Sequence, residues 1–357
     1  MRVTHYARRS LAAAGLALAL AGCKNDGASP SAFDPQGTAA DMAAAQDAFA
    51  SGPTANFAAV GPDISLALSG SPLVASSAAL ALSNPSKVSQ QYARKIASLV
   101  PAGASGIQAS VVAIPTEVAG KTFVWDESTD TYVASDVSGA PSNGVRFLLY
   151  AVDPVTFGPV EPVVETGYVD VIDQSTSAVA NVRIKVVEAS VTYLDYQVVA
   201  SATSSSGLVT ISGFAFNGTT RANFTLRNTV SVNQSDSTLV LSLDYALDVP
   251  SRDLSIDWTA TFANISATDV AVTLDLTVNG RNGNVRLVGT SGVNGGTFTV
   301  KVNGDTFATI TVTASTLVVT GATGDPLTSD EEQALEAVFD SYEGSLIAFA
   351  DLLMPVG

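Results

Sequence analysis

The feature that most constrains the fold is an alternation of apolar and polar residues in the second half of the chain. It runs through residues 224–232, 239–248, 254–262 and 270–278. The third stretch sets apolar residues at every second position: Leu254, Ile256, Trp258, Ala260 and Phe262. Successive side chains of a strand point to opposite faces of a sheet, whereas a helix repeats every 3.6 residues. The alternation therefore predicts long strands with one buried and one solvated face.

Short turns separate these strands. Asn217-Gly218 and Asn303-Gly304 are two-residue hairpin signals, because both residue types accept a positive φ. Residues 279–283, Asn-Gly-Arg-Asn-Gly, predict a slightly longer turn. Residues 207–320 thus predict a meander of about eight antiparallel strands, each roughly 30 Å long at about 3.3 Å per residue.

Strand patterns begin further upstream, near Ile107. Residues 121–126 and 130–135 are rich in β-formers around Glu127-Ser128-Thr129, which predicts a hairpin. Further strands are expected at 145–152 and 163–172, and one long or two consecutive strands at 180–200. Residues 107–357 are therefore assigned to one antiparallel β domain. Division of 107–320 into two immunoglobulin-like sandwiches stays open, although the strands are long for that architecture.

The C-terminus predicts an amphipathic helix over residues 329–353. Ser329 with Glu332, or Thr328 with Glu331, forms a capping box. Apolar residues then follow at helical spacing: Leu335, Val338, Phe339, Tyr342, Leu346, Phe349, Ala350 and Leu353. Gly344 is where we expect a kink. Because the apolar face of a large sheet must be covered, we predict a mainly β (β-rich α+β) fold. It is a long up-and-down meander, curved or half-barrel in shape, packed on this helix and on N-terminal helices.

Residues 38–106 form an Ala- and Ser-rich segment in which we expect helices. Thr38 with Asp41 predicts the start of a helix over Ala39–Ala50. A second helix is expected from Pro85 or Ser86 to Val100, with Val88, Tyr92, Ile96 and Leu99 on one stripe. Residues 61–83 are apolar without a clear period and are not assigned.

The first residues of the chain have the pattern of a signal peptide. Arg2, Arg8 and Arg9 precede an apolar run that is too short to span a membrane. The run ends in Leu20-Ala21-Gly22-Cys23, which resembles a bacterial lipobox. The resemblance implies that residues 1–22 are removed and that Cys23 becomes the lipidated N-terminus. Residues 23–37, polar with Pro and Gly, then predict a lipidated tether.

This resemblance also implies a cellular location. Two or three acyl chains on Cys23 give stable anchoring, since each buried CH₂ contributes about 0.8 kcal/mol. Enteric lipoproteins are retained in the inner membrane by an aspartate after the cysteine, and here Lys24 follows. We therefore expect a lipid-anchored protein of the bacterial cell envelope, on the periplasmic face or the surface of the outer membrane.

Composition excludes several classes of function. The chain carries 17 Lys and Arg against 33 Asp and Glu, a net charge of −16. Three arginines leave with the signal peptide, so 14 basic residues face 33 acidic ones and the mature charge is −19. The lone histidine, His5, leaves as well, which excludes histidine-based catalysis and metal binding. Acidity without a basic run argues against nucleic acid as a partner. We expect no enzymatic activity, no cofactor and no metal.

Several acidic clusters are candidate sites, and each has a structural interpretation. Asp126, Glu127 and Asp130 surround one turn but lack the spacing of a calcium loop. Asp170 and Asp173 offer the carboxylate pair that glycoside hydrolysis needs. A chain with 33 acidic residues, however, contains such pairs by chance. Asp330, Glu331 and Glu332 lie in the first turn of the last helix, where negative charge is stabilising. Asp244, Asp257 and Asp275 form an acidic stripe on the polar faces of three strands, where solvation explains them.

The two tryptophans could stack on sugars, but Trp258 falls on the apolar face of its strand and is assigned to the core. Trp125 shares a strand face with Phe123 and is left undecided.

Two functions remain. The first is a non-catalytic envelope lipoprotein that binds an apolar ligand, such as an acyl chain, between sheet and helix. In inferred architecture alone this is similar to the periplasmic lipid-binding lipoproteins. The second is a structural or adhesive surface lipoprotein that acts through the polar, Thr/Ser/Asp-rich sheet face.

Overall fold

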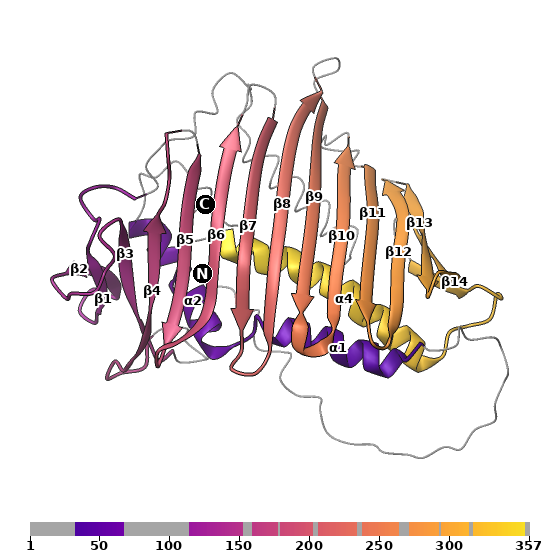
Figure 1. The fold of residues 1–357 in the computed structure, drawn as a ribbon, viewed down its shortest axis with the longest axis horizontal. Coiled ribbons are helices and arrows are strands. Elements are labelled where there is room, and N and C mark those ends of the chain that lie inside the picture. The colour runs from indigo at the N-terminus through magenta and orange to yellow at the C-terminus, as the bar shows by residue number, and fades with distance from the viewer. Residues whose placement is uncertain are drawn as a thin grey trace. The chain divides into compact units, whose positions relative to one another are not determined.

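The computed structural model describes residues 33–67, 114–152, 159–177, 179–202, 206–233, 238–263, 271–292, 294–313 and 317–353. They belong to one compact unit, Ala32–Gly357. Fifteen strands in these ranges form a single open sheet (Figure 1). The fold is therefore mainly β, and the division into two sandwiches is wrong.

The strands before the central meander are short to medium in length. They are β1 (Thr122–Asp126), β2 (Thr131–Ser135), β3 (Gly144–Tyr150), β4 (Glu165–Asp173), β5 (Ala180–Glu188) and β6 (Val191–Ala202). The hairpin predicted around residues 127–129 is confirmed by the pairing of β1 with β2. The stretch 180–200 forms two strands, β5 and β6.

The central and last strands carry the alternation seen in the sequence. They are β7 (Ser206–Phe216), β8 (Arg221–Asn233), β9 (Thr238–Val249), β10 (Leu254–Ala263), β11 (Ala271–Gly280), β12 (Gly283–Gly292), β13 (Gly295–Val302), β14 (Asp305–Val312) and β15 (Leu317–Gly321). A 3₁₀ turn, η1 (Pro250–Arg252), joins β9 to β10.

The strand order follows the chain from β3 to β15, and each of these pairs is antiparallel. The expectation of a purely antiparallel sheet is wrong at one end, where β1 pairs with β3 in parallel. The connection after β2 returns past β1, so that β3 enters the sheet beside β1 instead of beside β2.

The turns are in part tighter than predicted. Asn303 and Gly304 have φ of +51° and +95°, which confirms the two-residue hairpin between β13 and β14. The turn between β11 and β12 consists of Arg281 and Asn282 alone, since Gly280 already pairs with Gly283. The Asn217-Gly218 prediction is wrong in length. Residues 217–220 form the loop, and the Asn217 side chain accepts hydrogen bonds from the backbone N–H groups of Thr219 and Thr220 (3.0 and 2.8 Å).

The N-terminal helices are α1 (Pro35–Asp47) and α2 (Gly52–Ala67). The predicted cap at Thr38 is wrong: the Asp34 carboxylate accepts a hydrogen bond from the Gly37 N–H (3.0 Å), and Pro35 stands in the first turn. The helix thus includes the last residues of the predicted tether. Most of α2 was not foreseen, and the helix predicted over 85–100 lies outside the described residues.

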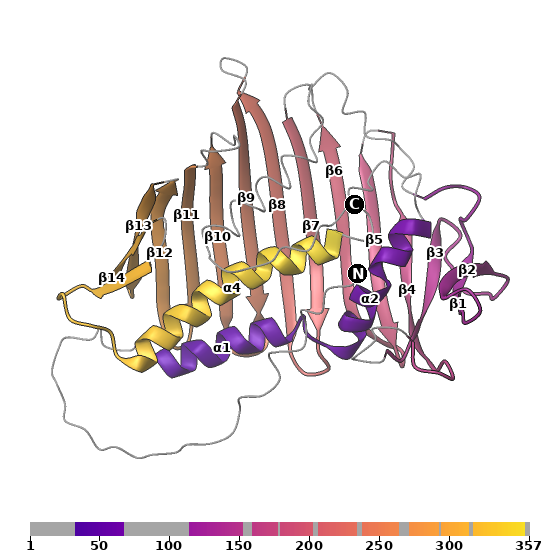
Figure 2. The same ribbon diagram turned by 180° about the vertical axis from the view of Figure 1, so that it is seen from behind.

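The C-terminal helix α4 spans Ser329–Leu353 and runs through Gly344 without interruption. Thr328 and Glu331 form its capping box. The Glu331 carboxylate accepts from the Thr328 N–H at 2.8 Å, and the Thr328 hydroxyl accepts from the Glu331 N–H at 3.4 Å. Helices α1, α2 and α4 all lie against the same face of the sheet, which we call the inner face (Figure 2).

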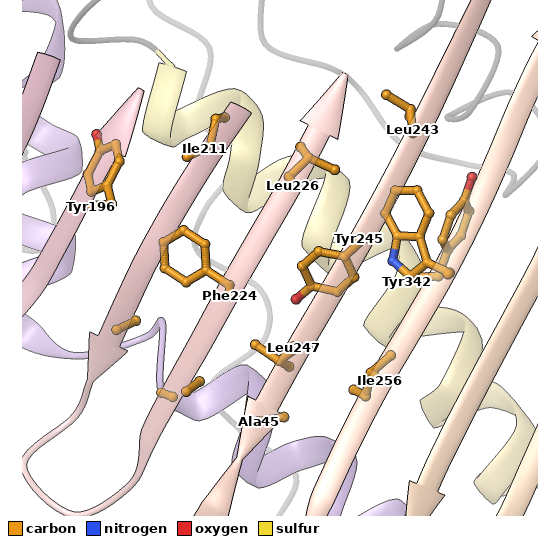
Figure 3. Packing of buried hydrophobic residues seen from close by; sticks show 14 of the residues in the cluster. Ala45, Tyr196, Ile211, Phe224, Leu226, Leu243, Tyr245, Leu247, Ile256 and Tyr342 are labelled. Atoms are coloured by element: carbon orange, nitrogen blue, oxygen red, sulfur yellow. The ribbon is translucent and has the colours of Figure 1, made fainter. Parts of the chain in front are cut away.

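Aromatic and aliphatic side chains of the sheet and the helices form one buried cluster between the inner face and the helices (Figure 3). Each helix contributes a ring or contacts one on the sheet. The ring centroids of Phe57, on α2, and Tyr196 are 6.5 Å apart. Those of Phe49, which follows α1, and Phe224 are 5.5 Å apart. Burial of this apolar surface, at about 25 cal/mol per Å², holds the helices on the sheet.

Candidate functional site

The opposite, outer face carries the polar members of the alternation, and strand register sets them in rows. One row consists of hydroxyl residues that stand directly opposite one another from β8 to β14: Thr229, Ser242, Thr261, Thr273, Thr290, Thr297 and Thr311. We call it the hydroxyl row. Threonine favours strands, and cross-strand hydroxyl pairs stabilise a sheet by about 0.2–1 kcal/mol each. Stability alone is a sufficient reason for this row.

A second row, nearer η1, pairs its polar groups internally. It contains Asn223, Asp248, Ser255, Asn279 and Asn284, in register from β8 to β12. Asn223 donates to Asp248 at 3.5 Å, Asn279 donates to Ser255 at 3.3 Å, and Asn284 donates to Asn279. We call it the amide row. Its side chains satisfy one another and leave little for a ligand.

Between these two rows the outer face is hollowed by an open depression of about 940 Å³ over β8–β13. We call it the outer depression. Three basic and three acidic side chains line it: Arg227, Arg286, Lys301, Asp244, Asp257 and Asp275. The small, exposed Ala246 lines the depression between its register neighbours, Thr225 on β8 and Asp257 on β10.

Only one ion pair within the described residues involves the outer depression. Arg286 donates to both oxygens of Asp275, at 2.9 and 2.6 Å. Hydrogen bonds from this guanidinium lower the pKa of Asp275. Arg227, Lys301, Asp244 and Asp257 form no ion pair with any described residue.

Asp257 is the least compensated carboxylate of the depression. Partial burial raises its pKa, and no described cation offsets that effect. Its register partners, Ala246 and Thr277, carry no charge. The depression therefore combines free hydrogen-bond acceptors with free donors.

The structure brings together the acidic stripe predicted from the sequence, because Asp244, Asp257 and Asp275 all line the outer depression. The basic residues that interleave with them were missed. The signal was available, since Arg227, Arg286 and Lys301 occupy polar positions of the same alternation.

Asp170, Asp173 and Asp126, which the sequence offered as candidate site residues, accept hydrogen bonds from neighbouring residues. Asp170 accepts two hydrogen bonds from Arg146, at 2.7 and 2.8 Å, whereas Asp173 accepts from the Ser175 N–H. Asp126 accepts from the backbone and hydroxyl of Ser128, and these bonds lower its pKa. Within the described ranges no three metal-ligating side chains gather.

The predicted tryptophans differ in environment. Trp258 is 1% exposed and lies on the inner face, as expected of a core residue. Trp125 is half-buried, with its ring 5.5 Å from that of Tyr132.

The lipobox residues Leu20, Ala21, Gly22 and Cys23 lie outside the described residues. None of the described helices combines the length and the apolarity needed to cross a membrane.

Comparison with known proteins gives this chain no relative: no family model, no curated protein and no solved structure matches it.

Proposed function

We propose that the protein is a non-catalytic lipoprotein of the cell envelope, anchored through Cys23, that binds a polar partner on its outer sheet face. The observation that carries the binding role is the outer depression, with its unpaired Arg227, Lys301, Asp244 and Asp257. Arg227 and Asp244 stand directly opposite each other on β8 and β9 without forming an ion pair, so both remain available to a partner. The tether would hold this face away from the lipid surface.

The packing of the inner face favours binding on the outer face over binding of an apolar ligand between sheet and helices. Where the structure describes the space between sheet and helices, side chains such as Trp258, Tyr245 and Tyr342 contact one another. The outer face, by contrast, is open.

A sedimentation experiment tests the proposal. The secreted chain with Cys23→Ala, which lacks the anchor, is mixed with envelope fragments of the producing cell and pelleted. The double variant Arg227→Gln, Asp257→Asn is expected to lose most of the bound fraction. Lys185→Gln is the matched control, because Lys185 lies on the outer face of β5 away from the depression. Equal binding by the double variant and the control would contradict the proposal.

A second candidate function, the binding of an apolar ligand beneath the helices, has one observation in its favour. The side-chain oxygen of Asn228 and the indole N–H of Trp258 are buried without a hydrogen-bond partner. Both residues are on the inner face, and an orphaned buried polar group costs about 1–3 kcal/mol. A lipid headgroup or linkage could satisfy them. Mass spectrometry of an organic extract of the purified protein tests this: stoichiometric lipid supports it, and a lipid-free protein contradicts it.

A further inference from the structure

The unpaired groups of the outer depression define the chemistry of its partner. We propose that the outer depression binds a neutral saccharide chain, which donates hydrogen bonds to Asp244 and Asp257 and accepts them from Arg227 and Lys301. This inference rests on the proposed function and names the ligand class for the same site.

The mixture of donors and acceptors is the first step. A carboxylate only accepts hydrogen bonds, while a guanidinium or an ammonium only donates them. A ligand that satisfies both must itself donate and accept at closely spaced positions. Sugar hydroxyls do both, and adjacent hydroxyls on a ring can address the two oxygens of Asp257 or the fork of Arg227.

The mixed charge of the depression disfavours polyanions, polycations and apolar ligands. A polyanion would meet three carboxylates in the depression and a chain whose net charge is −16. A polycation would meet Arg227, Arg286 and Lys301. An apolar ligand would strip water from the four unpaired charges without replacing their hydrogen bonds. A neutral polyhydroxyl ligand incurs none of these penalties.

The layout of the depression favours a chain over a single sugar. Asp257, Thr277, Arg286 and Lys301 stand in direct register on β10, β11, β12 and β13. Neighbouring strands are about 4.8 Å apart, so this line extends over about 14 Å. The depression is open, and the hydroxyl row flanks it, so a chain could run across the strands and beyond the charged groups.

The state of Asp257 supports the same conclusion. Asp257 is exposed, yet its carboxylate is desolvated enough to raise its pKa, and it forms no ion pair with a described residue. Hydroxyl donors from a ligand would replace the lost hydration of the charged form.

Native gel electrophoresis in gels that contain dissolved polysaccharide tests the inference. The Cys23→Ala chain is run in gels with a neutral dextran, galactomannan or β-glucan, and in gels with anionic alginate. We expect at least one neutral polymer to slow the chain and alginate not to. Asp257→Asn should weaken the affinity that causes this retardation roughly tenfold, because the variant loses a charge-assisted hydrogen bond.

A steric variant separates the binding site from simple charge effects. Ala246→Phe fills the floor of the depression and leaves every charge in place, so it should abolish the retardation. Lys185→Gln should retain it, and urea midpoints no lower than that of the unaltered chain show that the variants are folded. Retardation by alginate alone, or full retardation of Ala246→Phe, would overturn the inference.

The two proposals fail in different ways. If none of these neutral polysaccharides slows the chain while the double variant still loses envelope binding, the saccharide inference is wrong and the polar-face function stands. If envelope binding is also insensitive to the double variant, both are wrong.

Discussion

The indole ring of Trp258 lies edge-on to the phenol ring of Tyr342, with ring centroids 5.0 Å apart and an interplanar angle of 79°. Trp258 belongs to β10 and Tyr342 to α4, and both are buried. Tyr245 of β9 packs on the same indole at 5.3 Å. The contact joins the C-terminal helix to the middle of the sheet, so it couples the two layers of the fold.

Tyr342→Ala should therefore destabilise the protein strongly. Removal of a large buried aromatic side chain costs about 3–5 kcal/mol. Tyr342→Phe keeps the ring contact and should cost much less. Urea unfolding followed by tryptophan fluorescence measures both, and similar midpoints for the Ala and Phe variants would show that the ring contact does not hold α4 in place.

Asn228→Leu should stabilise the protein. Asn228 is 3% exposed among apolar neighbours on β8, and its side-chain oxygen has no partner. Replacement by an apolar side chain of similar size removes a desolvation cost of about 1–3 kcal/mol. Asn223→Leu, on the outer face of the same strand, is the control. Asn223 is hydrogen-bonded to Arg221 and Asp248, so the control should gain nothing in the free energy of unfolding.

The long strands could be predicted because period two is a local property of the sequence. The C-terminal helix could be predicted for the same reason, from its cap and its apolar stripe. The parallel pairing of β1 with β3 could not be predicted from the sequence. It depends on where the chain returns to the sheet after β2, and no local pattern of residues specifies that. The start of α1 was misplaced because Asp34 and Pro35 form a stronger start signal than Thr38.

The candidate site could be predicted only in part, because its composition depends on register. A loop over residues 279–283 would have set Asp275 opposite Leu287. The two-residue turn at Arg281-Asn282 sets it opposite Val288, with Arg286 diagonal to it and close enough to pair. A slip of one residue exchanges the faces of a strand. The aspartates and the basic residues could both be found from alternation, but the pairing of Arg286 with Asp275 required the turn length.

Two aspartates of the outer depression should respond to pH in opposite directions. The raised pKa of Asp257 means that its ionised form is disfavoured in the folded state. That cost is fully present above the folded pKa and vanishes as pH falls below the unfolded value of about 3.9. Asp257→Asn should thus raise stability at neutral pH by up to about 0.5 kcal/mol, with no gain in acid.

Asp275 has a lowered pKa because of Arg286, so its contribution is present above about pH 3.9 and is lost as pH falls through the folded pKa. Asp275→Asn should cost about 0.2–1 kcal/mol at neutral pH and nothing in strong acid. Urea titrations at several pH values measure both variants. The same sign for the two at neutral pH would contradict these assignments.

Cys23→Ala should release the protein from membranes, because the resemblance of residues 20–23 to a lipobox implies that Cys23 is the acylated residue. One acyl chain gives marginal binding and two or three give stable anchoring, so the loss of all of them should move the protein to the soluble fraction. The measurement is fractionation of an enteric host that expresses the full chain. Lys24→Asp is the matched control, since it leaves Cys23 intact: it should stay in the membrane fraction but shift from the outer to the inner membrane. If Cys23→Ala pellets with membranes as the unaltered chain does, the protein is held there by something other than an acylated Cys23.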